Sequence, residues 1–199
     1  MSRRAFRTVL GAAALTVLAG CGMGGGVVPR STPEPAPQSG FPADVPQELQ
    51  VKEPKDAQGI PACDLLTREQ LVELGLDPAT AKPESRMLAE SCLWYYADGS
   101  TFASVSISTD PTATKLPGMY RLHHAEAGFE ILEIAGHPAL RFDLDPSIQC
   151  GLAVGAADFQ NLGTDGYFDR KPRPDICAQS RRMAEMILSN LPPLIEEAR

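Results

Sequence analysis

SCLWYY at residues 91–96 and TFASVSIS at residues 101–108 are two strand-like stretches with a turn signal, Asp98-Gly99, between them. Aromatic and β-branched residues favour strands, and the alternation of the second stretch predicts a strand that buries one face. Asp-Gly is typical of a tight hairpin turn. The pattern therefore predicts a β-hairpin whose second strand turns its apolar residues to the core and its serines to water or to an open cleft.

Further strands are predicted downstream of this hairpin. A second hairpin is expected from residues 130–134 and 139–142, with its turn at residues 135–138. Residues 150–154 predict a fifth strand and residues 159–162 a short sixth one. Loops are expected at residues 78–86 and 163–174, where turn-forming and charged residues cluster.

A short helix is predicted upstream of the hairpin, over residues 67–74. Thr67 with Gln70 is a capping-box pattern, in which each side chain pairs with the backbone N–H of the other residue. Leucines at helical spacing give this helix one apolar face, and Gly75 is a typical stop signal.

Two more helices complete the predicted elements. Residues 119–127 predict a short one, and Asp175 is a good N-cap for a longer amphipathic helix that ends at Asn190. The element order indicates an α+β domain: an antiparallel sheet of about five to six strands with the N- and C-terminal helices packed on one face.

The N-terminal segment has the three parts of a bacterial lipoprotein signal. Three arginines at residues 3–7 precede an apolar run at residues 9–18, and Leu18-Ala19-Gly20-Cys21 matches a lipobox. The apolar run is too short to span a bilayer, which takes about 20 residues. We expect residues 1–20 to be removed and Cys21 to be lipidated, which would hold the protein on the outer face of the cell membrane. An ordinary secretory signal before a coincidental cysteine is the alternative.

Residues 21–58 are expected to form a flexible tether to a globular domain at residues 59–199. Glycines follow the lipobox directly, and seven prolines recur among polar residues along the segment. Such a composition has too little apolar surface to offset its ordering entropy, and its prolines keep it extended. Ser31, Thr32 and Ser39 leave O-glycosylation open as an alternative to a bare linker.

The mature chain is acidic. Residues 1–20 carry three of the 18 basic residues and none of the 25 acidic ones, which leaves a formal net charge near −10. This charge disfavours nucleic acid and anionic membrane surfaces as partners. Membrane attachment is therefore expected to depend on the lipid at Cys21 alone. No cofactor is predicted.

Four further cysteines, at positions 63, 92, 150 and 177, predict two disulfides, because their number is even and the domain is expected to be exported. Three pairings are possible, and closure between sequence neighbours favours Cys63–Cys92 and Cys150–Cys177. Each would close a loop of about 28 residues and contribute roughly 3–4 kcal/mol on the chain-entropy model. A four-cysteine metal site is the alternative, but the short spacing of zinc ligands is absent.

Several short motifs follow one another along the chain: CDLLT at residues 63–67, CLW at 92–94, GHPA at 136–139, a strand from Cys150, and a last helix from Cys177 to Leu191-Pro192. Together with the lipobox they resemble the actinobacterial lipoproteins of the domain-of-unknown-function-3558 family, over about residues 60–192. The resemblance implies an exported lipoprotein domain. It implies no catalytic residue, because the family has no established activity.

The motifs of several enzyme classes are absent from the sequence. It contains no Gly-x-Ser-x-Gly elbow, no phosphate-binding glycine loop before a lysine and no Cys-x-x-Cys. His123 and His124 are neighbours on a predicted helix and point about 100° apart, so they are poor ligands for one metal ion. No metal site is predicted.

A few residues are candidates for a ligand or acid site. Trp94 and Tyr96 face one side of their strand, as core residues or as an aromatic platform. Asp143 and Asp145 share one strand face, where paired acids could bind Ca²⁺ or act in acid catalysis, with a solvated strand end as the plain alternative. His137 is expected to be exposed in its turn.

These features favour a non-catalytic envelope lipoprotein over an enzyme. We expect a binding or accessory module for an apolar ligand or an envelope protein, attached to the membrane through the lipid on Cys21. One alternative is a lipid or glycolipid carrier with a cavity between sheet and helices. Another is a small hydrolase that uses Asp143 or Asp145 with His137.

Overall fold

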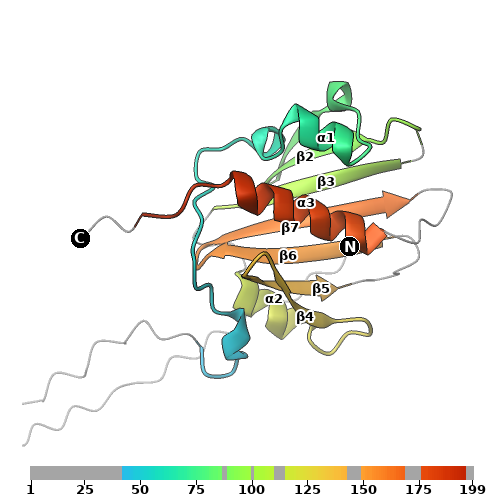
Figure 1. The fold of residues 1–199 in the computed structure, drawn as a ribbon. Coiled ribbons are helices and arrows are strands. Elements are labelled where there is room, and N and C mark those ends of the chain that lie inside the picture. The colour runs from blue at the N-terminus through green and yellow to red at the C-terminus, as the bar shows by residue number, and fades with distance from the viewer. Residues whose placement is uncertain are drawn as a thin grey trace, which may run out of the picture. The chain divides into compact units, whose positions relative to one another are not determined.

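A single antiparallel sheet of seven strands forms the centre of the domain (Figure 1). The computed structural model describes residues 42–86, 89–99, 101–109, 115–142, 149–168 and 176–195. The strands are β1 Lys82–Arg86, β2 Ala89–Tyr95, β3 Thr101–Ser108, β4 Glu130–Ile134, β5 His137–Phe142, β6 Gln149–Ala157 and β7 Gln160–Phe168. They lie in the order β1-β2-β3-β7-β6-β5-β4, and neighbours run antiparallel.

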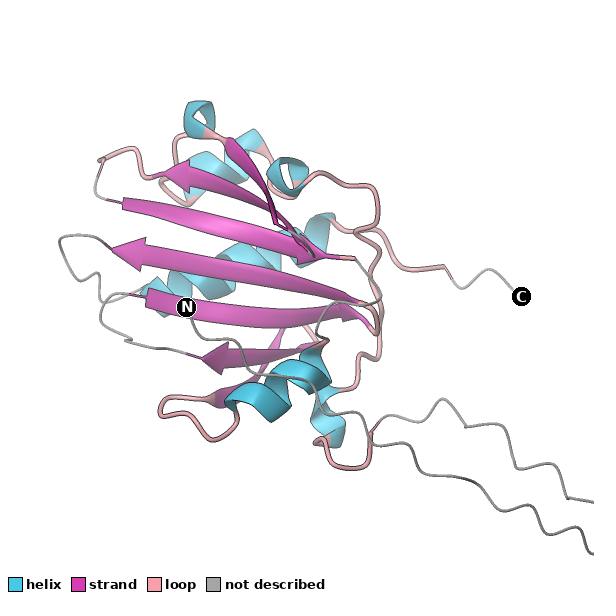
Figure 2. Cartoon of the chain, turned by 180° about the vertical axis from the view of Figure 1, so that it is seen from behind, coloured by secondary structure: helices cyan, strands magenta, loops and turns pink. Residues whose placement is uncertain are grey.

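Helices cover the two faces of this sheet unequally. α3 (Ile176–Asn190) crosses the centre of one face, and α1 (Arg68–Glu73) lies over the β1–β2 end of the same face (Figure 1). The expected packing of both helices on one face is confirmed. α2 (Leu116–His123) lies on the opposite face, over β5 and β6 (Figure 2). The short 3-10 helices are η1 Gln47–Leu49, η2 Ala62–Asp64 and η3 Pro78–Thr80.

The first predicted hairpin and the first predicted helix are both confirmed. Along β3, Ala103, Val105 and Ile107 are buried, and the serines that alternate with them are half-buried on the other face. At the start of α1, the Gln70 N–H donates to Thr67 Oγ1 at 3.2 Å, and the Thr67 N–H donates to Gln70 Oε1 at 2.9 Å. These two bonds satisfy N–H groups that a helix start otherwise leaves unpaired.

One apolar core fills the space between α3 and the sheet. Trp94 and Leu162 from the sheet and Met183 and Ile187 from α3 are among its fully buried side chains. α3 approaches β7 closely at Gly166, where a Cβ would lie 2.9 Å from Ile176 Cγ1. A larger residue at this position would therefore push the first turn of α3 away from the sheet.

The sheet has seven strands, not the five to six expected, because the expected loop at residues 78–86 is wrong. η3 and β1 occupy this segment. β1 has the sequence KPESR and pairs with β2 alone, at the edge of the sheet. Edge strands tolerate proline and charged residues, since one of their sides faces no partner strand. The segment therefore lacks the apolar alternation by which a strand is recognised.

The expected loop at residues 163–174 is also wrong for residues 163–168, which continue β7. β7 lies between β3 and β6 in the middle of the sheet. Its glycines and polar residues are typical of turns, but here they make room for neighbours. A Cβ at Gly163 would clash with Ser106 Oγ on β3, and Gly166 lies under α3.

Residues 42–51, here called the strap, pack on the domain, so the expected tether boundary at residue 58 is wrong. Val45 and Leu49 are buried in a second apolar cluster with Leu116 of α2 and with Leu140 and Ala153 of the sheet. Val45 and Leu49 thus anchor to the domain a segment whose average composition is that of a linker.

Further bonds join the chain between the strap and residue 58 to the sheet. The Lys55 N–H donates to the Ala156 carbonyl at 2.7 Å, and the Ala57 N–H donates to Gln160 Oε1 at 2.7 Å. The packed domain therefore includes this segment as well as the strap.

Both favoured disulfides are present. Cys63–Cys92 joins η2 to β2 with a Cα–Cα distance of 5.0 Å, and Cys150–Cys177 joins β6 to α3 with a Cα–Cα distance of 5.2 Å. Each therefore fixes a helical element to the sheet face that α1 and α3 cover.

The edges of the sheet are occupied by β1 and β4. β1 contains Pro83, which has no N–H to offer, and the charged residues Lys82 and Glu84. At the other edge, Arg181 of α3 donates to the backbone carbonyl of Glu133 on β4 at 2.9 Å.

Candidate functional site

The expected ligand or acid site is not assembled from the described residues. Trp94 and Tyr96 lie on and directly after β2, whereas His137 opens β5, and β3, β7 and β6 lie between the two strands. Four strand steps of about 4.8 Å place these side chains roughly 19 Å apart. Asp143 and Asp145 lie outside the described residues, as does Cys21.

Trp94 and Tyr96 are core residues, not a ligand platform. Trp94 is fully buried and Tyr96 is 3% exposed, while Tyr95 between them is 48% exposed on the other face. The Tyr96 hydroxyl donates to Gln179 Oε1 of α3 at 2.7 Å, which holds the last helix against the end of β2. The alternation expected along this strand is confirmed.

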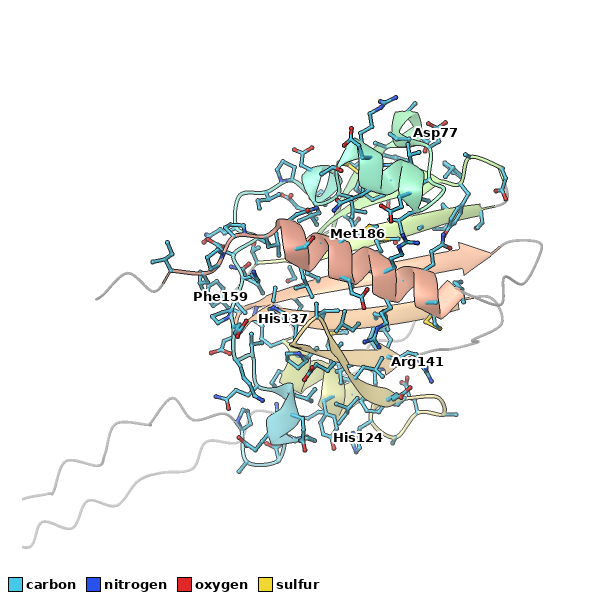
Figure 3. The ribbon with its side chains drawn as sticks, in the orientation of Figure 1. Asp77, His124, His137, Arg141, Phe159 and Met186 are labelled. Atoms are coloured by element: carbon cyan, nitrogen blue, oxygen red, sulfur yellow. A yellow bond between two sulfur atoms is a disulfide. The ribbon has the colours of Figure 1, made fainter. Side chains whose placement is uncertain are left out.

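The expected exposure of His137 is wrong, since its side chain is buried (Figure 3). The hairpin turn consists of Ala135 and Gly136, which both have positive φ, so His137 is the first residue of β5 and not part of the turn. Its Nδ1 donates to the Gly155 carbonyl on β6 at 2.9 Å. His137 therefore has a structural contact inside the sheet.

The two neighbouring histidines of α2 each contact residues close to the helix. His123 lies 3.0 Å from Glu126 Oε1 and stacks on Phe142, and His124 stacks on Tyr120. Within the described ranges, no group of three or more histidine, cysteine, aspartate and glutamate side chains is arranged to hold a metal ion. None of the described helices is long and apolar enough to cross a membrane.

Within the described residues, the face of the sheet opposite α3 is covered by α2 and by the strap at β5 and β6. There, α2 and the strap bury Leu140 and Ala153. Over β1, β2, β3 and β7 no described helix covers this face, as the view from behind shows (Figure 2). This uncovered area, here called the serine face, holds a pocket of about 470 Å³. Its lining residues are Glu84, Ala89, Ser91, Leu93, Phe102, Ser104, Ser106 and Asp165.

Strand register explains how these residues meet. Ser91 on β2 lies opposite Ser106 on β3, and Ser104 on β3 lies opposite Asp165 on β7. Successive side chains of a strand point to opposite faces, so the residues that alternate with the buried core of β2 and β3 gather here. The Ser91 hydroxyl on β2 donates to the Glu84 carbonyl on β1 at 3.2 Å. This bond joins the edge strand to its neighbour at the pocket.

A second pocket, of about 480 Å³, lies between the strap, the first turn of α2 and the turn that joins β6 to β7. Its apolar lining includes Leu49 and Leu116, and its two cations are engaged. Lys115 Nζ donates to the Phe159 carbonyl at 2.9 Å, and Arg121 donates two hydrogen bonds to the Asp44 carboxylate at 2.7 and 2.8 Å. These contacts hold the strap and the turn to α2.

Comparison with known families identifies the chain. A family described as protein of unknown function, DUF3558, matches residues 16–190. The chain belongs to the DUF3558 family. A search of curated proteins and a search of solved structures each found no significant match.

The match to DUF3558 begins before the lipobox cysteine and ends with α3. It therefore includes the strap and all seven strands of the sheet, and with them the serine face. The family description assigns no activity, so the function of this DUF3558 domain has to be argued from its own residues.

Sequence reasoning found part of this surface and missed the rest. The alternation of residues 101–108 predicts that Ser104 and Ser106 leave the core, which is confirmed. Sequence reasoning missed Glu84 and expected Asp165 in a loop, because β1 and the second half of β7 lack strand signals. The second pocket was missed because the strap has the composition of a linker.

Proposed function

We propose that the protein is a non-catalytic binding module of the cell envelope that meets its partner through the serine face. A lipid on Cys21 holds it on the outer face of the cell membrane, and the residues between that lipid and the strap act as the tether. The observation that carries the proposal is the contrast between the two halves of one sheet face, since among the described elements helix and strap cover one half and leave the other open.

The pocket of the serine face supports this choice of surface. Its volume of about 470 Å³ lies within the range of roughly 300–1,000 Å³ that is typical of small-molecule sites. By contrast, the space between the sheet and α3 is filled by core side chains such as Trp94 and Met183. A carrier with its cavity between α3 and the sheet does not fit this packing.

The residues of the serine face favour binding over hydrolysis. Ser104 lies opposite Asp165, but a serine nucleophile also needs a neighbouring base. The three histidines of the chain lie on α2 and at the start of β5, outside this pocket. A serine beside a carboxylate offers hydrogen bonds to a ligand without activating the hydroxyl.

Site-specific cross-linking in intact cells tests the proposed surface. A benzophenone amino acid is placed at Ser104 in the full-length protein, and the same group is placed at Val72, which is 61% exposed on α1, for comparison. We expect adducts at position 104 in several-fold excess over position 72. Equal adduct formation at both positions would contradict the proposal.

The anchor is tested separately with Cys21→Ala. The wild-type protein should begin at Cys21, carry acyl mass and sediment with the membrane fraction. The variant should lose the acyl mass and the membrane attachment. A mature wild-type protein that begins elsewhere, or that lacks acyl mass, would refute the lipid anchor.

A further inference from the structure

We infer that the serine face binds a neutral polyhydroxylated chain, such as a segment of glycan. The inference rests on the proposed function, which names the surface, and adds the chemical class of the ligand. It is carried by the hydroxyl groups of the pocket floor, the aromatic residue at its side and its balance of charge.

The floor of the pocket offers hydroxyl groups that the described residues leave without a partner. The side-chain hydroxyls of Ser104 and Ser106 make no hydrogen bond to another residue of the described ranges. A serine hydroxyl both donates and accepts, as each hydroxyl of a sugar does. An apolar ligand would cover these groups without pairing them, which is unfavourable. A ligand rich in hydroxyl groups pairs them.

The lining of the pocket extends over several neighbouring strands. Next to Ser106 lies Gly163, and next to Asp165 lies Gly151, so neither of these neighbours adds a side chain of its own. A Cβ at Gly151 would lie 3.0 Å from Asp165 Oδ1, which shows that the carboxylate leans over the glycine. From Glu84 on β1 to Asp165 on β7 the lining spans three strand steps, about 14 Å. An extended chain matches this shape better than a compact molecule.

An aromatic residue borders the floor. Phe102 lines the pocket, and its ring lies edge-on to the exposed Tyr95, with 6.1 Å between the ring centroids. The apolar faces of sugar rings stack on aromatic side chains, while the sugar hydroxyls point outward to polar groups. The serines and Phe102 thus offer both kinds of contact within one pocket.

The charges at the pocket do not select an ionic ligand. Glu84 is paired with Lys82, whose Nζ lies 3.2 Å from Glu84 Oε1. Asp165 is the other carboxylate of the lining, and it also has contacts within the protein. A basic peptide would need more negative charge than these two carboxylates provide beside Lys82. A neutral ligand can donate hydrogen bonds to both carboxylates, and its binding needs no additional negative charge.

Calorimetric titration of the mature lipidated protein in nanodiscs tests the inference. The probes are three neutral oligosaccharides, namely cellotetraose, maltotetraose and N-acetylated chitotetraose, with tetralysine and octanoate as charged and apolar comparisons. We expect saturable binding of at least one oligosaccharide at submillimolar to millimolar concentration, and no saturable binding of tetralysine or octanoate.

Variants locate that binding. The double variant Ser104→Ala/Ser106→Ala should weaken oligosaccharide binding by roughly tenfold, the effect of losing about two net hydrogen bonds. Phe102→Ala should weaken it by a similar factor. Ser189→Ala, on the exposed side of α3, is the matched control and should bind as the wild type does. Each variant should keep a cooperative melting transition.

The outcomes separate the inference from the proposed function. If cross-linking favours position 104 but no oligosaccharide binds, or if tetralysine binds instead, the glycan inference is overturned and the proposed surface stands. Oligosaccharide binding that the double serine variant leaves unchanged also overturns the inference. If cross-linking does not favour position 104 and no oligosaccharide binds, the proposed surface fails with it.

Discussion

His137 is a buried polar residue whose side chain links two strands of the sheet. It is 3% exposed, and its Nδ1 pairs with the Gly155 carbonyl of the neighbouring strand at 2.9 Å. Because a buried carbonyl that loses its partner raises the free energy of the folded state, this contact contributes to stability. Its position at the start of β5 also ties this strand to β6 next to the hairpin turn.

We predict that His137→Ala lowers the free energy of unfolding by about 2–3 kcal/mol, from the lost hydrogen bond and the cavity left by the ring. Urea unfolding measures this value. His124→Ala is the control, because His124 lies on the exposed side of α2 and should change stability by less than about 0.5 kcal/mol. Equal effects of the two variants would show that the buried contact contributes nothing.

Gly166 allows a second prediction at this scale. A Cβ there would lie 2.9 Å from Ile176 Cγ1, so Gly166→Ala should destabilise the domain by about 1–3 kcal/mol. Combination with Ile176→Ala, which removes the opposing Cγ1, should cost less than the sum of the two single changes. Thermal unfolding of the two variants checks this, and a double variant less stable than the sum of both changes would be inconsistent with a steric cause.

Among the elements, α1 depends most on its first turn, because it has only six residues. Thr67→Ala removes the hydroxyl that accepts the Gln70 N–H and should lower the free energy of unfolding by about 1 kcal/mol. Thr67→Ser keeps the hydroxyl and should cost a few tenths. Chemical denaturation distinguishes the two, and an alanine variant as stable as wild type would argue against the capping box.

The two disulfides act on different elements with similar loop sizes. Their sequence separations are 29 and 27 residues, so the chain-entropy model gives each about 3–4 kcal/mol. The paired variants Cys63→Ala/Cys92→Ala and Cys150→Ala/Cys177→Ala should therefore lose similar amounts of stability in denaturant. A much larger loss for one pair would point to effects in the folded state, since the entropy of the open chain cannot supply it.

How far the sequence predicts these elements depends on where they lie. α1 and the β2–β3 hairpin have local signals, such as Thr67 with Gln70 and the alternation of β3, and both are confirmed. β1 has none, because an edge strand needs no apolar alternation. The local signals of β7 are misleading, because its glycines make room for neighbouring side chains and do not form turns. The serine face depends on both strands, so its serines could be predicted but not its carboxylates.

For the whole molecule, the strap is the N-terminal part of the packed domain that the structure describes. The guanidinium of Arg121 donates two hydrogen bonds to the Asp44 carboxylate and lowers the pKa of Asp44 to about 2. When the strap is released, the carboxyl group has its ordinary pKa near 4. Docking of the strap is therefore favoured by ionised Asp44 above about pH 4, and this contribution disappears as the pH falls through about 2.

We predict that the strap becomes accessible in this pH window. Pepsin, which is active there, should cleave within residues 42–51 faster at pH 2 than at pH 4 in the wild type. Asp44→Asn cannot ionise, so it should already show the faster cleavage at pH 4. Dividing the cleavage rate of the wild type by that of Asp44→Asn at each pH cancels the pH dependence of pepsin itself. A ratio that stays constant between pH 4 and pH 2 would show that the ion pair does not hold the strap.

The edges of the two outer strands matter if the proposed lipid anchor holds many copies of the protein on one membrane surface. An edge strand with unpaired N–H and C=O groups can pair with a strand of another copy. Confinement to two dimensions raises the frequency of such encounters. Here Pro83 on one edge strand has no N–H to donate. On the other edge strand, the guanidinium of Arg181 donates a hydrogen bond to the Glu133 carbonyl. Crowded copies on a bilayer are therefore expected to stay apart and not to grow into fibrous aggregates.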